Sequence, residues 1–206
     1  MTNRDSKAQL QGSTRISMAD LAAPGRLIEI SGRGVNARLS TAVNLLRQAQ
    51  IEGETSAWIQ PEEGDLYPPD LAAAGIDLQS LIVLHLPTDQ GARDLLRASE
   101  WLLRSGAYGL IVIDLSGVRA PAPTNQAWCA RLVALAREHG TRILLITDTP
   151  ASQSSLGPLI GLRIAAQRSP PLAGQCTLNV HVLKNKSGGP LRVVPETWRA
   201  PSGLEA

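Results

Sequence analysis

The chain has 206 residues, of which 43% are hydrophobic and 18% are charged, and its formal net charge is +2. This balance excludes disorder as the main state, because a disordered chain combines few large apolar residues with a high net charge. No apolar run approaches the roughly 18 residues that cross a bilayer, and the first ten residues lack the hydrophobic core of a secretory signal. Cys129 and Cys176 are too few for a disulfide scaffold and fit no metal-ligand spacing. We therefore expect a cytoplasmic protein without a metal site.

Charge is distributed unevenly along the chain. Residues 51–80 contain seven acidic residues and neither lysine nor arginine, so the other residues carry all 20 basic side chains and 11 of the 18 acidic ones. Such segregation can steer an anionic partner toward one face, but alone it does not indicate nucleic-acid binding.

Short apolar runs alternate with helix-like segments over the first three quarters of the chain. The expected strands are 26–31, 55–60, 81–86, 109–115 and 142–147, and the expected helices between them are 36–50, 71–74, 90–105 and 124–139. Strands that alternate with helices predict an α/β fold with a mostly parallel central sheet and helices on both faces.

The pattern changes after Pro150. Three β-rich runs, at 162–167, 178–184 and 191–194, are separated by turn-like segments. They predict antiparallel strands added to the sheet at its C-terminal end. We expect a flexible arm over residues 1–20, one core domain over 21–195, and a C-terminal tail over 196–206 that is shortened at its end.

The junction between the first strand and the next helix has the position of a phosphate-binding loop. The working pattern G-x-x-x-x-G-K-[ST] wraps phosphates with backbone N–H groups, and its lysine and hydroxyl serve the nucleotide and Mg²⁺. Here Gly32 and Gly34 are present, but Ala37, Arg38 and Leu39 replace the second glycine, the lysine and the hydroxyl. Leucine cannot hold Mg²⁺, and arginine is bulkier and forked where a compact ammonium is needed. We expect no bound cofactor and no regular hydrolytic site.

Several segments in order resemble the core of the RecA recombinases. TSAWIQPEE resembles the strand that ends in the water-activating glutamate, here Glu62, and GLIVIDLSG carries a strand-end aspartate, Asp114. VHVLKNKSGG resembles the turn with paired lysines, here Lys184 and Lys186, which in active filaments reach the neighbouring subunit's nucleotide. The resemblance covers residues 25–195 and implies a RecA-like three-layer sandwich.

The departures from RecA are also informative. Asp148 stands where RecA-like proteins carry a glutamine switch, and the loops after the fourth and fifth strands look shortened. Of two families of non-catalytic relatives, the chain resembles the ImuA accessory proteins of SOS mutagenesis more than the division inhibitor SulA. That resemblance implies a non-enzymatic adaptor whose partners are RecA, the ImuB polymerase-like adaptor and an error-prone polymerase.

Two alternatives from other classes stay open. One is a division inhibitor similar to SulA, which binds FtsZ, and the other is a residual ATPase that uses Arg38, Asp114 and Glu62. The ordinary interpretation of Asp114 is a loop cap or a partner of Arg38, and Glu62 belongs to a solvated acidic patch. We expect the protein to be a monomer or a closed dimer and not to assemble into a filament.

Four basic residues are candidates for binding a partner or an anion. Lys184 and Lys186 lie two residues apart on one side of a strand. Either they bind an anion, or their charges keep an edge strand from pairing with another chain. Arg119 and Arg131 flank the region that holds DNA in RecA. Since few aromatic residues lie nearby, we expect weak, salt-sensitive DNA binding at most.

The large aromatic residues and one histidine complete the set of candidates. Trp58 and Trp101 are expected in the core or at its edge, whereas Trp128 and Trp198 are candidate partner anchors. His85 lies within an apolar strand and is expected to be an interior residue.

Overall fold

The structure is a computed structural model that describes residues 17–33, 36–119, 127–170, 172, 175–188, 193 and 195–199. Its strands are β1 (Leu27–Ser31), β2 (Ser56–Pro61), β3 (Leu81–Leu86), β4 (Leu110–Asp114), β5 (Arg142–Thr147), β6 (Leu162–Arg168), β7 (Gln175–Asn185) and β8 (Glu196–Arg199). They form one eight-stranded sheet in the order β3-β2-β4-β5-β1-β6-β7-β8. In this order, β3, β2, β4, β5, β1 and β6 run parallel to one another. β7 is antiparallel to β6, and β8 is antiparallel to β7.

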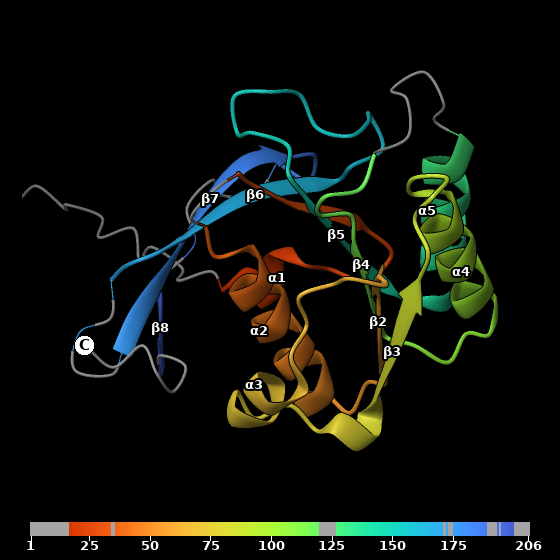
Figure 1. Ribbon diagram of the computed structural model, residues 1–206. Helices are drawn as coiled ribbons and strands as arrows, with labels where there is room; N and C mark the ends of the chain where they lie inside the picture. Colours follow the sequence, from red (N-terminus) through yellow and green to blue (C-terminus); the bar gives the residue numbers. More distant parts are fainter. Residues whose placement is uncertain are drawn as a thin grey trace, which may run out of the picture.

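Helices cover both faces of this sheet. They are α1 (Met18–Leu21), α2 (Arg38–Ile51), α3 (Pro68–Ala73), the 3₁₀ turn η1 (Leu78–Ser80), α4 (Arg93–Arg104) and α5 (Ala127–His139). Figure 1 shows α1, α2 and α3 on one face and α4 and α5 on the other. The α/β fold with a mostly parallel sheet and added antiparallel strands is therefore confirmed.

The alternation of side chains along each strand divides the core into two halves. On β1, Ile28 and Ile30 pack toward α2, while Leu27 packs toward α4 and α5. β4 is buried at every position, as expected for a parallel strand covered on both faces. The central strands are thus held rigidly, and the ends of β1, β4 and β5 are fixed relative to one another.

The antiparallel extension differs in detail from the sequence-based expectation. β6 runs parallel to β1, so the antiparallel part begins only at β7. β8 pairs with β7 at residues 196–199, beyond the core boundary expected at residue 195. The expected strand at 191–194 lies almost entirely outside the described residues. At the other end, Met18 is buried in the core, so the ordered core begins before residue 21.

Three expectations for single side chains were wrong. Trp128 is buried against the core on α5 and cannot serve as an exposed anchor, whereas Trp101 is 59% exposed on α4. His85 is exposed, because β3 is an edge strand and not an interior one. Trp58 is fully buried, as expected. The side chain of Trp198 lies outside the described residues.

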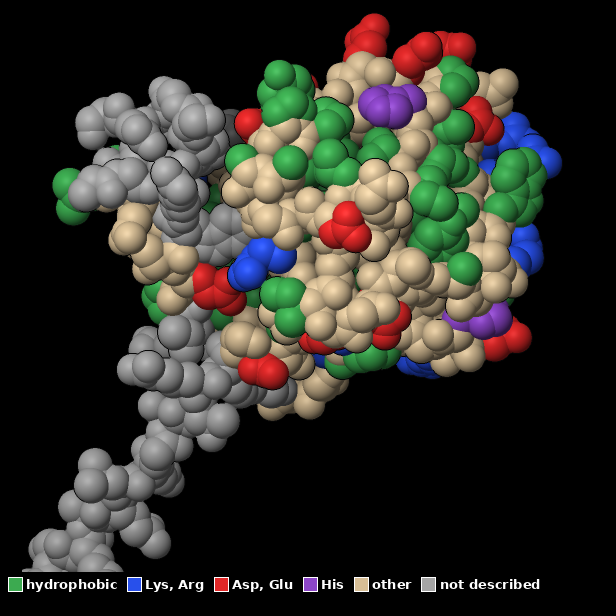
Figure 2. Space-filling model, turned by 90° about the horizontal axis from the view of Figure 1, so that it is seen from below, with side chains coloured by type: hydrophobic (Ala, Val, Ile, Leu, Met, Phe, Trp, Pro, Cys, Tyr) green, Lys and Arg blue, Asp and Glu red, His purple; other side chains and the backbone are tan. Residues whose placement is uncertain are grey.

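The surface at the lower end of the molecule is mixed in character. Figure 2, which views the molecule from below Figure 1, shows acidic and basic side chains scattered among hydrophobic and polar ones. In the described part of the chain, no helix is both long and apolar enough to cross a membrane.

Candidate site at the carboxyl ends of the central strands

The sheet order brings the sequence-predicted loop and two carboxylates to one edge. The loop from Gly32 to Ala37 follows β1, Asp114 ends β4, and Asp148 follows β5, which lies between β1 and β4. In open α/β sheets, ligand sites lie beyond the carboxyl ends of the strands. This edge is therefore the candidate site. Gly34 and the residue after it lie outside the described residues.

Backbone N–H groups of the loop donate to the neighbouring strands. The N–H of Ala37, at the position of the second glycine, donates to the carbonyl of Ala166 on β6 at 3.0 Å. The N–H of Gly32 donates to the carbonyl of Thr147 on β5 at 3.2 Å. A phosphate loop needs such donors directed at its ligand. In this fold, these two donors stabilise the junction between the loop and the sheet.

The Arg38 side chain bridges the loop to the end of β5. Its Nη1 lies 2.5 Å from Oδ1 of Asp148 and 2.6 Å from the carbonyl oxygen of Thr147. Its Nε donates to Oδ1 of Asn36 at 2.9 Å, and that same oxygen accepts the Arg38 N–H at 3.0 Å. The Asn36 side chain thereby caps α2, since Ala37 has no polar side chain to do so. Arg38 is thus directed at protein acceptors.

Asp148 joins three loops at this edge. In addition to Arg38, it accepts a 2.6 Å hydrogen bond from the N–H of Gly117, in the turn that follows β4. Burial acts to raise the pKa of Asp148, but the bonds from Gly117 and Arg38 outweigh it and hold that pKa below its ordinary value. At the expected position of the glutamine switch, the chain therefore has an ionised carboxylate fixed by an arginine.

Asp114 and Glu62 have different surroundings. Asp114 is buried, accepts a 2.9 Å hydrogen bond from the N–H of Ser116, and has a pKa raised by burial. It therefore caps the turn after β4, one of its two expected roles, whereas the ion pair of Arg38 is with Asp148. Glu62 is exposed beyond β2, three strands from β1 in the sheet order. The structure thus brings Arg38, Asp148 and Asp114 together but leaves Glu62 apart.

A second polar network, not predicted from the sequence, connects β5, β1 and β6. Glu29 is fully buried and pairs in register with Arg163 on β6. Its carboxylate lies 3.6 Å from Arg163 Nε and accepts hydrogen bonds from the Thr147 hydroxyl and the Leu156 N–H, each at 3.1 Å. Burial raises the pKa of Glu29 despite these favourable contacts. A glutamate inside the apolar run RLIEIS was the sequence signal for such a buried partner.

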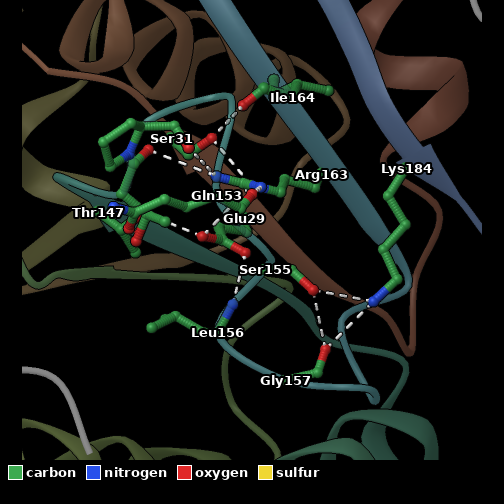
Figure 3. A network of polar contacts seen from close by, with 12 residues as sticks. Glu29, Ser31, Thr147, Gln153, Ser155, Leu156, Gly157, Arg163, Ile164 and Lys184 are labelled. Atoms are coloured by element: carbon green, nitrogen blue, oxygen red, sulfur yellow. Dashed lines mark hydrogen bonds and ion pairs between the residues drawn. The ribbon is translucent and has the colours of Figure 1, made fainter. Parts of the chain in front are cut away.

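Arg163 extends this network into the loop between β5 and β6 (Figure 3). It donates from Nε to the Ser31 hydroxyl at 3.1 Å, from Nη2 to the carbonyl of Pro150 at 2.8 Å, and from Nη1 to the carbonyl of Gln153. The arginine is only 3% exposed. A buried charged side chain with this many acceptors fixes the loop against the sheet.

The two predicted lysines have separate roles. Lys184 Nζ donates inward, to the Ser155 hydroxyl at 3.0 Å and to the Gly157 carbonyl at 3.2 Å (Figure 3). Burial, and then the charge of Lys186, lower the pKa of Lys184. Lys186 follows β7 and is exposed. Of the predicted pair, therefore, Lys186 is free to extend into solvent and Lys184 holds the β5–β6 loop.

The two predicted arginines lie beside α4. Arg131 on α5 forms an ion pair with Glu100 on α4, with Nε 2.7 Å from Oε1. Arg119 is exposed, and its carbonyl accepts the N–H of Ala92 at 3.2 Å. Gly91 has a φ of 70°, and a Cβ there would lie 2.9 Å from that carbonyl, so this close approach requires glycine. The rest of the loop between Arg119 and α5 lies outside the described residues.

The fold and the loop position define a RecA-like α/β protein. Residues 8–127 match the RecA N-terminal domain, and the chain belongs to that family.

Similar proteins carry the name RecA. The Clostridium novyi protein is 35% identical over 97 residues, which are 47% of this chain and 27% of the relative. The Fusobacterium nucleatum protein is also 35% identical over 97 residues, 25% of its length. The Salinispora tropica protein is 30% identical over 135 residues, 62% of this chain and 38% of the relative. The matches thus span between a quarter and two fifths of these relatives.

Proposed function

We propose that this RecA-like protein is a non-catalytic adaptor in SOS-induced translesion synthesis, as in the ImuA proteins that it resembles. It acts in the cytoplasm by binding RecA, an ImuB-like polymerase adaptor, or both, and thereby controls where an error-prone polymerase works. The observation that carries the proposal is the bridge from Arg38 to Asp148, which joins the loop after β1 to the end of β5. The fold is retained while the groups at the nucleotide position bind one another.

The chemistry of the loop supports a role without ATP hydrolysis. To bind a phosphate there, Ala37 would give up Ala166 as its acceptor and Arg38 would give up Asp148. Replacing a satisfied hydrogen bond by another gives little net free energy, on the order of 1 kcal/mol. Leu39 supplies no oxygen for Mg²⁺. ATP hydrolysis would then lack a side-chain ligand for the metal. It would also lack a positioned base, because Glu62 is exposed beyond β2.

Direct binding measurements test the adaptor role. The protein is immobilised for interferometry and exposed separately to RecA filaments on single-stranded DNA, to free RecA, and to an ImuB-like adaptor. We expect saturable binding to at least one of these proteins and only weak, salt-sensitive binding to single-stranded DNA alone. Failure to bind any of the three proteins would contradict the proposal.

The two alternative functions have their own readouts. A residual ATPase predicts ATP turnover that is lost in Glu62→Gln, whereas the adaptor proposal predicts no turnover above a heat-inactivated control. A SulA-like inhibitor predicts that expression makes cells grow as filaments and that the protein binds FtsZ. Either result, obtained without binding to RecA or an ImuB-like adaptor, would replace the adaptor proposal.

A further inference from the structure

The outward face of α4 carries three arginines around one tryptophan. Arg93, Arg97, Trp101 and Arg104 are spaced by four, four and three residues, and all four are exposed. This spacing places them on one side of a helix whose opposite side is buried. We call these four residues the Arg–Trp stripe. Figure 1 shows that α4 and α5 cover this side of the sheet, and the exposure of all four side chains places the stripe on the outside of that layer.

The tryptophan in this stripe is unusual for its exposure. Trp101 is 59% exposed, whereas Trp58 and Trp128 are buried. The guanidinium of Arg97 lies over the indole ring, 5.0 Å from its centroid, and so fixes its orientation. A large aromatic side chain held in place at the surface loses little conformational entropy on binding and offers a wide apolar contact. This is the property of an interface anchor.

The charge around the stripe is positive. Glu100, on the buried side of α4, is held by Arg131 at 2.7 Å and by Arg104 at 3.5 Å. α4 carries three arginines and two acids, Asp94 and Glu100. With Arg131 of α5 included, four arginines face two carboxylates, which leaves a charge balance of +2. The side chains of Arg104 and Arg131 are still about half exposed. Their remaining donors point to an anionic partner.

The shape and composition of this surface favour a protein over a nucleic acid. Single-stranded DNA is bound by grooves in which successive aromatic side chains stack on successive bases. The stripe lies instead on the convex side of one helix and has a single ring, one face of which Arg97 covers. Tryptophan and arginine are also the residues most enriched among strongly contributing positions of protein interfaces. The arm over residues 1–16 of a second copy is an unsuitable occupant, because its three basic residues outnumber its one acid.

We propose that the Arg–Trp stripe is a docking surface for an acidic segment of a partner protein. Carboxylates of that segment pair with Arg93, Arg97 and Arg104, and an apolar side chain covers the open face of Trp101. The inference goes beyond the adaptor role, because it specifies the surface and the chemistry of its ligand and holds whichever protein supplies the segment.

The test uses a fluorescein-labelled peptide of aspartate, glutamate and leucine and measures anisotropy with the full chain at low salt. We expect saturable binding to the wild type that weakens at least tenfold in Arg97→Glu and in Trp101→Ala. Matched controls place the same changes elsewhere: Arg168→Glu on β6 and Tyr67→Ala before α3, both at exposed positions, are expected to bind as the wild type does. Circular dichroism checks that each variant is folded.

Three outcomes would overturn this proposal. The first is a wild-type protein that does not bind the peptide, and the second is equal weakening in the control variants, which indicates unspecific charge attraction. The third is tighter binding of labelled oligo(dT) than of the peptide, with the loss of oligo(dT) binding confined to Arg97→Glu and Trp101→Ala. That last result would assign the stripe to single-stranded DNA. Because the probe is a peptide, failure here leaves the RecA and adaptor measurements above unaffected.

Discussion

Arg38 stands where a phosphate-binding loop carries lysine, and its guanidinium contacts Asn36, Thr147 and Asp148. Lysine could not make this set of contacts, because a guanidinium directs several N–H groups in fixed directions. The substitution therefore adds a connection between the loop and β5 as well as removing a phosphate ligand. The negative charge that pairs with it comes from Asp148, at the position where RecA-like proteins carry glutamine.

Removing Asp148 tests the strength of this connection. Asp148→Ala deletes the partner of Arg38 and the acceptor of the Gly117 N–H. Because the Asp148 side chain is 39% exposed, solvent screens the pair, and we expect a loss of only about 1 kcal/mol in the free energy of unfolding. Urea denaturation measures this loss, with Asp65→Ala in the exposed acidic segment as the control. An unchanged midpoint in Asp148→Ala would contradict the assigned role.

The buried carboxyl of Glu29 predicts a pH dependence of stability. Its folded-state pKa is raised above the ordinary value of 4.5 by burial. The folded state therefore holds a proton that the unfolded state has lost, and stability falls as pH rises from 4.5 through the folded-state pKa. We expect Glu29→Gln to make this fall shallower. Urea denaturation across that range measures the slope, and exposed Glu63→Gln is the control. Equal slopes in wild type and Glu29→Gln would contradict this prediction.

At the scale of elements, the loop between β5 and β6 is held by side chains from two strands, β6 and β7. Arg163 reaches it from β6, and Lys184 reaches it from β7. From the sequence, Lys184 was expected either to bind an anion or to protect an edge strand, and in both cases to point away from the molecule. Strand alternation gives the side on which a lysine lies, but it cannot show that a loop from a distant part of the chain covers that side. The inward role of Lys184 follows from tertiary structure alone.

Substitution of Lys184 should loosen this loop selectively. Lys184→Met removes the bonds to Ser155 and Gly157 and keeps the apolar part of the side chain. We expect faster amide hydrogen exchange and proteolysis at residues 153–157, with little change in the global free energy of unfolding. Lys186→Met, two residues away and exposed, is the matched control. Similar exchange rates in both variants would show that Lys184 does not hold the loop.

The strength of sequence prediction also differs between strands and helix faces. The strands Leu81–Leu86 and Arg142–Thr147 begin and end at the predicted residues, because each is a β-branched and leucine-rich run with clear flanking turns. On α4 the leucines predict which side of the helix is buried. They do not show whether Trp101 belongs to that side, because it lies just beyond the row of leucines around the helix. The sequence pattern therefore predicted Trp101 in the core or at its edge, whereas the structure shows it exposed.

At the scale of the whole molecule, the sheet order decides which residues meet. The sequence predicted that Asp114 would lie near the loop after β1, where it would cap a turn or pair with Arg38. β5 lies between β1 and β4, so the residue after β5 is nearer to the loop. Strand order depends on long-range pairing, which periodicity does not report. The site positions could be predicted, therefore, but not the Arg38–Asp148 pairing.

The chain retains the RecA-like sheet, and the described loop donors at Gly32 and Ala37 are directed at its own strands. We propose that the protein acts through its surface and that its partners are proteins. The Arg–Trp stripe on α4 and the exposed Lys186 are among the described basic features available for such contacts. The adaptor role and the loop chemistry are thus two aspects of one account.

Calorimetric titration with ATPγS and Mg²⁺ tests the central claim, a loop that no longer binds nucleotide, most directly. A catalytically active RecA in the same buffer serves as the positive control, and Arg38→Lys/Leu39→Thr, which restores the pattern at these two positions, is titrated in parallel. We expect no measurable heat of binding for the wild-type protein. Saturable binding with micromolar affinity would contradict it, because the bridge between Arg38 and Asp148 would then open for a phosphate.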